Sequence, residues 1–365
     1  HARGGGARAL CAAGEDERGE ASLFYAATLC LNARNSVSLL EHRGDALRVV
    51  SSHAHLEEVW DIAWARGETQ QGARGGVLAT AYNDPKNGGR AGALYTAPGG
   101  ERGELERVCG LRGGTRRVCF GEGGALAAVG AEAVAAYDVN AGAERGSWGV
   151  AGHSEAFAEL GAAAWDPHSG GGSGRVGVAA GRSLFLVDAR SGELREGVPR
   201  AHSMRCRALA FNPRRENIVA TGGDDCRVRV WDLRRASEPV EDFGGGAGAH
   251  SHWVWTLAYS PQHEALLASG GSDGAVCLWL CGQGGGALSR AGSLTEPLSP
   301  QSAAGTGVNG AASMGLACAY DAHQDSVYSL GWCAADEFCI CSLAYDGTAV
   351  VSQVPRAAKF AALQA

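Results

Sequence analysis

The chain has 365 residues, 56 of them glycine, and a formal net charge of -7. A mildly acidic chain without a basic stripe is a poor candidate for nucleic-acid binding, so we exclude that class of partner. No apolar run approaches the roughly 18 residues of a membrane span, and the first residues contain no signal-peptide core. We therefore expect a cytoplasmic protein without a transmembrane segment.

The 12 cysteines argue against a metal site, because none of them forms a C-x-x-C pair. Many lie inside runs that read as strands, where a cysteine behaves as a small buried hydrophobe. We expect free thiols, and neither a bound metal nor a cofactor.

From the N-terminus, the first strand-like runs lie at 23–29 and 37–40. Further along, one strand after another ends in an aromatic residue: Trp64, Phe120, Trp165, Phe211, Tyr259 and Trp332. In four of these segments a histidine lies nine residues before the aromatic, namely His55, His202, His250 and His323. The segments that begin at His202 and His250 repeat most closely, 48 residues apart. Such a period is typical of β-propeller blades.

We predict an all-β fold, a single seven-bladed WD-repeat β-propeller over residues 1–356, followed by a C-terminal tail at 357–365. Each blade is expected to be a four-stranded antiparallel sheet with strands a to d. The expected blades lie at about 7–52, 53–108, 109–149, 150–198, 199–245, 246–320 and 321–356. Residues 281–314 are rich in Gly, Ala, Ser and Pro and are expected to form a flexible insertion between strands c and d.

Polar residues recur at matching places in the last three blades. One set is His202, Thr221, Asp225 and Trp231, a second is His250, Ser269, Asp273 and Trp279, and a third is His323, Ser342 and Asp346. A catalytic site occurs once in a protein, whereas this set recurs, so we predict that the protein is not an enzyme. The blades resemble those of WD-repeat proteins, in which such residues form a structural hydrogen-bond network. The resemblance implies the same role here.

Two non-repeating features suggest partner contacts. Trp253 stands beside Val254 and Trp255 and either contacts a partner or packs locally. Trp231, Asp232 and Arg234 resemble the box with which WD-repeat substrate receptors bind the adaptor of a cullin-RING ubiquitin ligase.

Several segments resemble the family of EARP- and GARP-complex-interacting WD-repeat proteins. They are GGDDC at 222–226, HSHWVW at 250–255, HQDSVY at 323–328, SLAYDG at 342–347 and VPRAAKF at 354–360. The resemblance implies a non-enzymatic scaffold that binds subunits of the EARP and GARP tethering complexes. It also implies action in endosomal recycling and endosome-to-Golgi retrograde transport, peripherally at the trans-Golgi network and recycling endosomes. A cullin-RING substrate receptor is the alternative function.

The chain departs from that family in two places. The insertion at 281–314 is nearly uncharged where the family has acidic residues, and the strand that precedes Ala7 in the family is replaced or absent. The last blade is therefore expected either to be completed by other residues or to keep an open edge. For partner binding we expect the face of the d–a and b–c connections, with these candidates: Arg205, Asp224, His252, Trp253, Asp325 and Tyr345.

Overall fold

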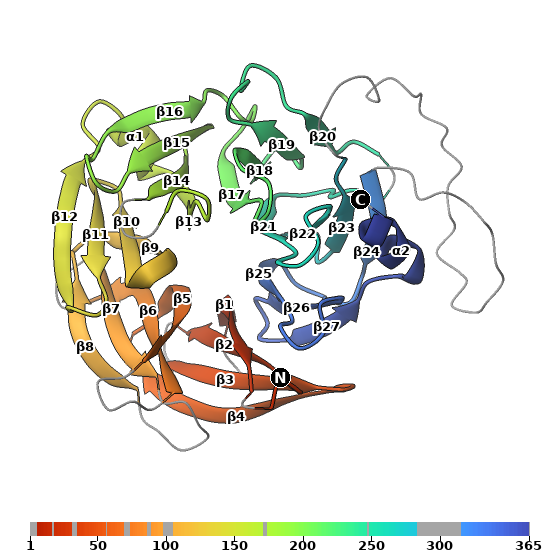
Figure 1. Ribbon diagram of the computed structural model, residues 1–365, viewed down its shortest axis with the longest axis horizontal. Coiled ribbons are helices and arrows are strands. Elements are labelled where there is room, and N and C mark those ends of the chain that lie inside the picture. The colour runs from red at the N-terminus through yellow and green to blue at the C-terminus, as the bar shows by residue number, and fades with distance from the viewer. Residues whose placement is uncertain are drawn as a thin grey trace.

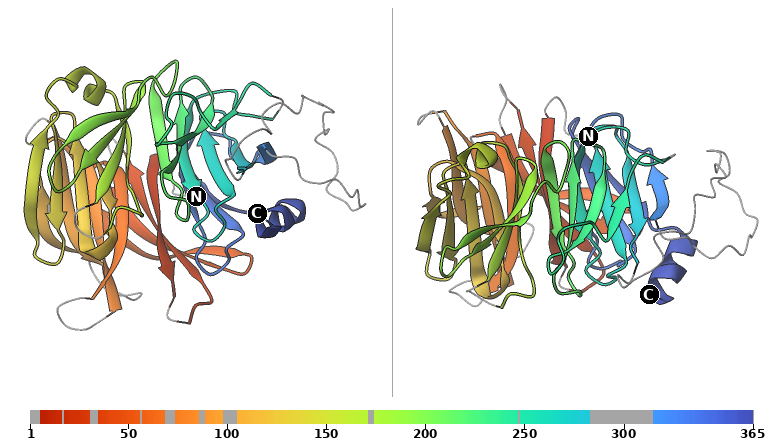
Figure 2. Two further views of the ribbon diagram at one scale, coloured as in Figure 1. Left: turned by 45° about the horizontal axis from the view of Figure 1, so that its top comes forward. Right: turned by 90° about the horizontal axis from the view of Figure 1, so that it is seen from above.

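The computed structural model describes residues 6–16, 18–30, 35–55, 57–68, 74–85, 89–97, 105–170, 174–246, 248–282 and 315–364. These residues form seven antiparallel sheets that stand around one axis, which makes the fold a seven-bladed β-propeller (Figure 1). Viewed from the side, the blades form a disc (Figure 2). Most of the expected insertion, from residue 283 to residue 314, lies outside the described residues.

The first four blades follow the chain in order, each from its inner to its outer strand. Blade 1 comprises β1 (Gly6–Glu15), β2 (Ser22–Leu29), β3 (Asn35–Arg43) and β4 (Ala46–His55). Blade 2 comprises β5 (Val59–Glu68), β6 (Arg74–Asp84), β7 (Gly89–Ala97) and β8 (Glu106–Leu111). Blade 3 comprises β9 (Thr115–Phe120), a 3-10 turn η1 (Glu122–Gly124), β10 (Ala125–Gly130), β11 (Ala133–Asp138) and β12 (Ala143–Gly149). Blade 4 begins with helix α1 (Ser154–Ala158) and comprises β13 (Leu160–Trp165), β14 (Arg175–Ala180), β15 (Ser183–Asp188) and β16 (Leu194–Val198).

The remaining blades are the ones with the clearest sequence repeat. Blade 5 comprises β17 (Cys206–Phe211), β18 (Ile218–Gly223), β19 (Val228–Asp232) and β20 (Glu241–Phe243). Blade 6 comprises β21 (Val254–Tyr259), β22 (Leu266–Gly271), β23 (Val276–Leu280) and β24 (Gly315–Tyr320). Blade 7 comprises β25 (Val327–Trp332), β26 (Cys339–Ala344) and β27 (Ala349–Gln353), and helix α2 (Arg356–Gln364) follows it. The first two blades end at His55 and Leu111, later than the boundaries expected at 52 and 108.

Blade 7 differs from the others because its sheet has three strands within the described residues. Its last strand, β27, has no backbone neighbour on the outer side there, as expected for an open edge. Helix α2 lies beside blades 6 and 7 and buries Ala358 and Ala362 in their shared core. A side chain from blade 6 also reaches this edge, where the hydroxyl of Tyr320 donates a hydrogen bond to the carbonyl of Gln353 at 2.7 Å.

The blades are held together face to face by buried apolar clusters. Among the described residues there are seven, and each is shared by two neighbouring blades. The cluster between blades 7 and 1 contains Phe24, Leu40 and Cys341, and among the described residues these two blades meet through it without exchange of a strand. Burial of apolar surface at about 25 cal/mol per Å² is the main source of stability for such contacts. All 12 cysteines are free thiols.

A buried hydrogen-bond network supports blade 5. His202 lies with Nδ1 2.7 Å from Asp225 Oδ1 and Nε2 2.9 Å from Thr221 Oγ1, and the indole N–H of Trp231 donates to the same hydroxyl at 2.9 Å. An ionised carboxylate only accepts, so Nδ1 carries the proton and the threonine hydroxyl donates to Nε2. Blade 6 repeats this arrangement with His250, Asp273, Ser269 and Trp279.

In blade 7 the network is incomplete, and the expected pairing of Asp346 with His323 is wrong. His323 Nε2 lies 2.7 Å from Ser342 Oγ, but its Nδ1 is buried without a hydrogen-bond partner. Asp346 instead accepts from the backbone N–H and the hydroxyl of Thr348, at 2.8 and 2.9 Å. The threonine two residues further along supplies both donors, so the carboxylate stays within its own turn.

Neutralisation of these two aspartates is expected to lower stability by different amounts. Burial tends to raise the pKa of Asp225, but the hydrogen bond from His202 and the charge of Arg229 hold that pKa well below its usual value. A carboxyl whose pKa is lower in the folded state stabilises the fold above its unfolded pKa of about 4, and this contribution is lost as the pH falls below that value. We expect Asp225→Asn to lower the free energy of unfolding at pH 7 by about 1–3 kcal/mol, and the loss to shrink below about pH 4.

The matched control is Asp346→Asn, which removes only an exposed turn contact and should change stability by less than about 1 kcal/mol. Urea unfolding of the three proteins at pH 7 and at pH 3.5 measures both effects. Equal losses for the two variants would contradict a specific role of the Asp225 carboxylate.

Candidate functional site

The side chains at one register position of the inner strands converge on the axis of the ring. Trp60, Arg207, Trp255 and Tyr328 are the second residues of β5, β17, β21 and β25, and each lies five residues after the histidine of its blade. These inner strands surround the axis in Figure 1. Their first residues follow the d–a connections, so this register belongs to the face that carries those connections and the b–c turns. We call it the d–a face.

Arg8 of β1 joins three of these rings. Its guanidinium carbon lies 4.5 Å from the ring centroid of Trp60, 4.6 Å from that of Tyr328 and 5.2 Å from that of Trp255. The rings come from blades 2, 7 and 6. A guanidinium over an aromatic face is attracted by the ring quadrupole, with about 0.5–1 kcal/mol at exposed sites and about 2 kcal/mol or more when desolvated.

Two more arginines extend this contact in both directions. Arg90, from β7, lies 4.0 Å from the Trp60 ring, and Arg207 lies 4.1 Å from the Trp255 ring and 4.7 Å from the Trp253 ring. We call the connected set the arginine–aromatic array, and it comprises Arg8, Trp60, Arg90, Arg207, Trp253, Trp255, Tyr328 and Tyr345. Tyr345 belongs to it because its ring lies 5.8 Å from that of Tyr328.

The positive charges of the array are unequally neutralised. Arg207 is paired with Asp224, to which both Nε and Nη2 donate. Among the described residues, the ion pairs include none between Arg8 or Arg90 and a carboxylate. Burial, followed by the charge of Arg117, lowers the pKa of Arg8 to about 9, and burial with the charge of Arg116 lowers the pKa of Arg90 to about 10. Both groups remain positively charged at neutral pH.

Two carboxylates act on this excess charge from a distance, Asp61 on Arg8 and Glu58 on Arg90. Asp61 lies 3.8 Å from Arg117 and accepts a hydrogen bond from the backbone N–H of Val118 at 2.9 Å. Burial raises the pKa of Asp61, against the opposing effect of Arg117. Arg117 also donates to the carbonyl of Gly161 at 2.6 Å, which fixes the guanidinium between blades 2 and 4. The inner rim therefore carries more guanidinium groups than carboxylates to pair them.

Three of the expected partner residues border the array with exposed or partly exposed side chains. Trp253 is 37% exposed and Tyr345 is 40% exposed, both large values for such apolar side chains. His252 is exposed, and its ring lies 4.8 Å from that of Trp253. Trp253 packs locally on Arg207 and Trp255, and part of its side chain is accessible, so its contact with a partner stays a prediction.

The other three expected partner residues mainly hold the protein's own backbone or side chains. Asp224 is buried and its carboxylate binds Arg207, so it is not presented to a partner. Arg205 donates to the carbonyl of Glu159 at 3.2 Å, and Asp325 accepts from the N–H of Ser326 at 2.7 Å. These positions lie on the d–a face, but their polar atoms have internal partners.

Sequence reasoning missed Arg8, Arg90 and Arg207 as site residues. The common register of Trp60, Trp255 and Tyr328 was visible in the repeat, and Arg207 occupies the same register, so that signal was available. Arg8 gave no such signal, because blade 1 lacks the histidine frame that defines the register in the other blades.

The possible ligase-adaptor box spans the end of strand c of blade 5, β19, and the residues that follow it, away from the d–a face. Trp231 is buried within the blade, whereas the Arg234 side chain is 68% exposed. Arg234 Nη2 donates to Asp232 Oδ2 at 2.7 Å, so the guanidinium is held by its own neighbour.

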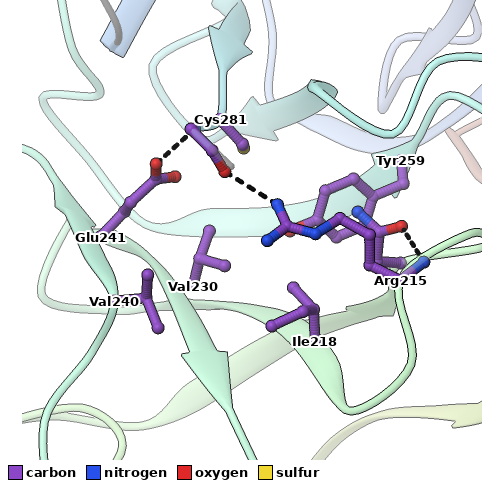
Figure 3. A pocket seen from close by; sticks show the side chains of 9 residues that line it. Arg215, Ile218, Val230, Val240, Glu241, Tyr259 and Cys281 are labelled. Carbon is purple, nitrogen blue, oxygen red and sulfur yellow. Dashed lines mark hydrogen bonds between the residues drawn. The ribbon is translucent and has the colours of Figure 1, made fainter. Parts of the chain in front are cut away.

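A small pocket between blades 5 and 6 lies where the described chain stops at Gly282 (Figure 3). Its lining includes Arg215, Glu241 and Tyr259. The N–H of Gly282 donates to Glu241, and Arg215 donates to the carbonyl of Gly282 at 2.8 Å. Burial raises the pKa of Glu241. The pocket's polar groups thus anchor the chain before residue 283, and we assign it a structural role.

In the described part of the chain, no three side chains of His, Cys, Asp and Glu residues come together as a metal site. Of its helices, none is long and apolar enough to cross a membrane.

Comparison with known proteins gives a consistent family. The family model described as EIPR1 beta-propeller matches residues 4–279. The EARP and GARP complex-interacting protein 1 of Rattus norvegicus is 28% identical over 177 residues, 47% of this chain and 44% of that protein. The EARP-interacting protein 1 of Caenorhabditis elegans is 34% identical over 194 residues, 50% of this chain and 49% of that protein. The chain thus spans about half the length of the curated relatives it matches.

The unequal charge balance predicts different stability effects for two arginines. Arg207→Met leaves the Asp224 carboxylate buried without its partner and should lower the free energy of unfolding by about 3–5 kcal/mol. Arg8→Met keeps an apolar side chain among the rings and removes a largely buried charge that forms no ion pair with a carboxylate. The free energy of unfolding should therefore change by less than about 1.5 kcal/mol. Urea unfolding at pH 7 measures both. A larger loss for Arg8→Met than for Arg207→Met would contradict this account of the array.

Proposed function

Because the chain belongs to the EIPR1 beta-propeller family, we propose that it is a non-enzymatic scaffold that binds a subunit of the EARP or GARP tethering complexes. The names of its relatives describe those proteins as interacting with these complexes. The proposal extends to a role in endosomal recycling and endosome-to-Golgi retrograde transport. The protein would act from the cytoplasm, peripherally at the trans-Golgi network and recycling endosomes.

The observation that carries the proposed binding surface is the exposed aromatic rim of the array. Trp253 and Tyr345 stand on the d–a face beside rigid inner strands, and tryptophan, tyrosine and arginine are the residues most enriched at the energetic centres of protein interfaces. Side chains on such a scaffold lose little conformational freedom when a partner binds. This supports the d–a face as the docking surface.

The non-enzymatic part of the proposal rests on the histidines. His202 and His250 are buried, and each bridges a carboxylate and a hydroxyl that the fold requires. A general base must reach a substrate, and these imidazoles are enclosed by their own blades. The same arrangement in two blades indicates structural networks.

Removal of two rim side chains tests the docking surface. We expect the double variant Trp253→Ala with Tyr345→Ala to retain less than about a tenth of the tethering-complex subunits that co-purify with the unchanged protein, since loss of one tryptophan that dominates an interface removes about 2 kcal/mol or more. Affinity purification followed by quantitative mass spectrometry measures the retained fraction. Undiminished co-purification by the folded double variant would show that the partner binds elsewhere.

The alternative function, a substrate receptor of a cullin-RING ligase, is favoured by one observation, the exposure of Arg234 next to Asp232. Arg234→Gln distinguishes the two proposals in the same purification. The scaffold proposal expects unchanged recovery of tethering subunits and no ligase adaptor with either protein. Recovery of an adaptor with the unchanged protein, and its loss with Arg234→Gln, would establish the alternative.

A further inference from the structure

The guanidinium groups of Arg8 and Arg90 lie on the d–a face without an ion pair among the described residues. Each guanidinium lies against the Trp60 ring, and neither has a carboxylate partner among the described ion pairs. Aromatic faces attract a cation but accept no conventional hydrogen bond from its N–H groups. Several donors of these two arginines are therefore free to bind an acceptor.

A second observation at the same place concerns Trp60. Its indole Nε1 is buried and has no hydrogen-bond partner within the described structure. A buried donor without a partner has a free-energy cost of about 1–3 kcal/mol, and such groups call for an explanation. Arg8 and Arg90 both lie against the Trp60 ring, so its indole N–H and the two guanidinium groups are close together on the inner rim.

The spacing of the two guanidinium groups suits an extended peptide. Both lie within 4.5 Å of the centroid of the Trp60 ring, so their central carbons are no more than about 9 Å apart. In an extended chain, alternate side chains on one side are roughly 7 Å apart. Two acidic side chains at positions i and i+2 can therefore face the two arginines together.

We propose that the arginine–aromatic array binds an acidic, extended segment of a protein partner, with alternate carboxylates on Arg8 and Arg90. The inference rests on the proposed function, since it names the kind of partner segment that this face takes. Planar guanidinium groups bind carboxylates through paired N–H···O bonds, which gives them directional specificity. The exposed rings of Trp253 and Tyr345 then flank the bound segment.

The same observations disfavour a nucleic acid. Bases bind by stacking on open aromatic faces, whereas the faces of Trp60 and Trp255 are already covered by arginines. Nucleic-acid affinity also grows with the number of phosphates neutralised, and a chain of net charge -7 offers few free cations. Two unpaired guanidinium groups match a short acidic peptide better.

Fluorescence anisotropy with a labelled ten-residue peptide tests the inference, using the whole chain. In the probe, aspartate alternates with serine, and a counterpart carries asparagine in place of aspartate. We expect the aspartate peptide to bind at least about tenfold more tightly than its counterpart, and its affinity to fall with added salt. Arg8→Met and Arg90→Gln should each weaken binding about tenfold or more, whereas Arg8→Lys should retain part of the affinity because it keeps the charge.

Arg190→Gln is the matched control, since Arg190 is an exposed arginine in the c–d turn of blade 4. It should bind the aspartate peptide as the unchanged protein does. Equal affinity for the two peptides would overturn the inference, as would full affinity in both array variants. Arg90→Gln keeps the test valid if Arg8→Met does not fold.

Two further arms separate this inference from others. The first uses vesicles that contain phosphatidylinositol phosphates. If the protein binds these vesicles through Arg8 but does not bind the aspartate peptide, the acidic-segment inference is overturned in favour of a lipid phosphate. The proposed function fails separately, if the unchanged protein recovers no tethering subunits although it binds the peptide through Arg8. In that case the inferred binding site for an acidic segment remains supported, and the partner that supplies the segment belongs to another complex.

Discussion

The packing of each blade against its two neighbours is the constraint on which everything else depends. The sheets are small, and each buries its faces only within the ring, through the seven shared clusters. This packing also sets the position of the inner strands, and with them the second-residue register. Arg8, Trp60, Trp255 and Tyr328 belong to four different blades, so no single blade contains the site.

The protein treats its buried polar groups in two contrasting ways. In blades 5 and 6 the histidine, the aspartate and the hydroxyl satisfy one another, as expected for groups whose role is to stabilise a turn. On the inner rim, Arg8 and Arg90 form no ion pair among the described residues, and Asp61 and Glu58 act on their charges only from a distance. The completed networks stabilise their own blades, whereas the guanidinium groups without an ion pair are the basis of the binding surface proposed above.

Much of the fold could be predicted from the sequence, because the propeller repeats a local pattern. The His202 and His250 networks could be expected because the recurring spacing resembles that of WD-repeat proteins, in which strand length and turn position bring these side chains together. In blade 7 the same spacing predicted a hydrogen bond between His323 and Asp346 that does not form, because Thr348 donates to Asp346 within the turn. Asp224 appeared available until its pairing with Arg207 was known. Arg8 was unpredictable for a different reason: its contacts lie across the ring, and no local pattern encodes them.

Arg8 connects parts of the chain that are far apart in sequence, and this has a consequence for folding. β1 meets blade 7 through contacts such as that of the Ser329 hydroxyl with the carbonyl of Leu10. Long-range contacts of this kind form late, because a large loop must close first. The complete array therefore forms only after the first and last blades have packed against each other. A ligand bound to the array would slow the separation of the first and last blades. Ligand binding would therefore stabilise the closed ring and occur only when the ring is closed.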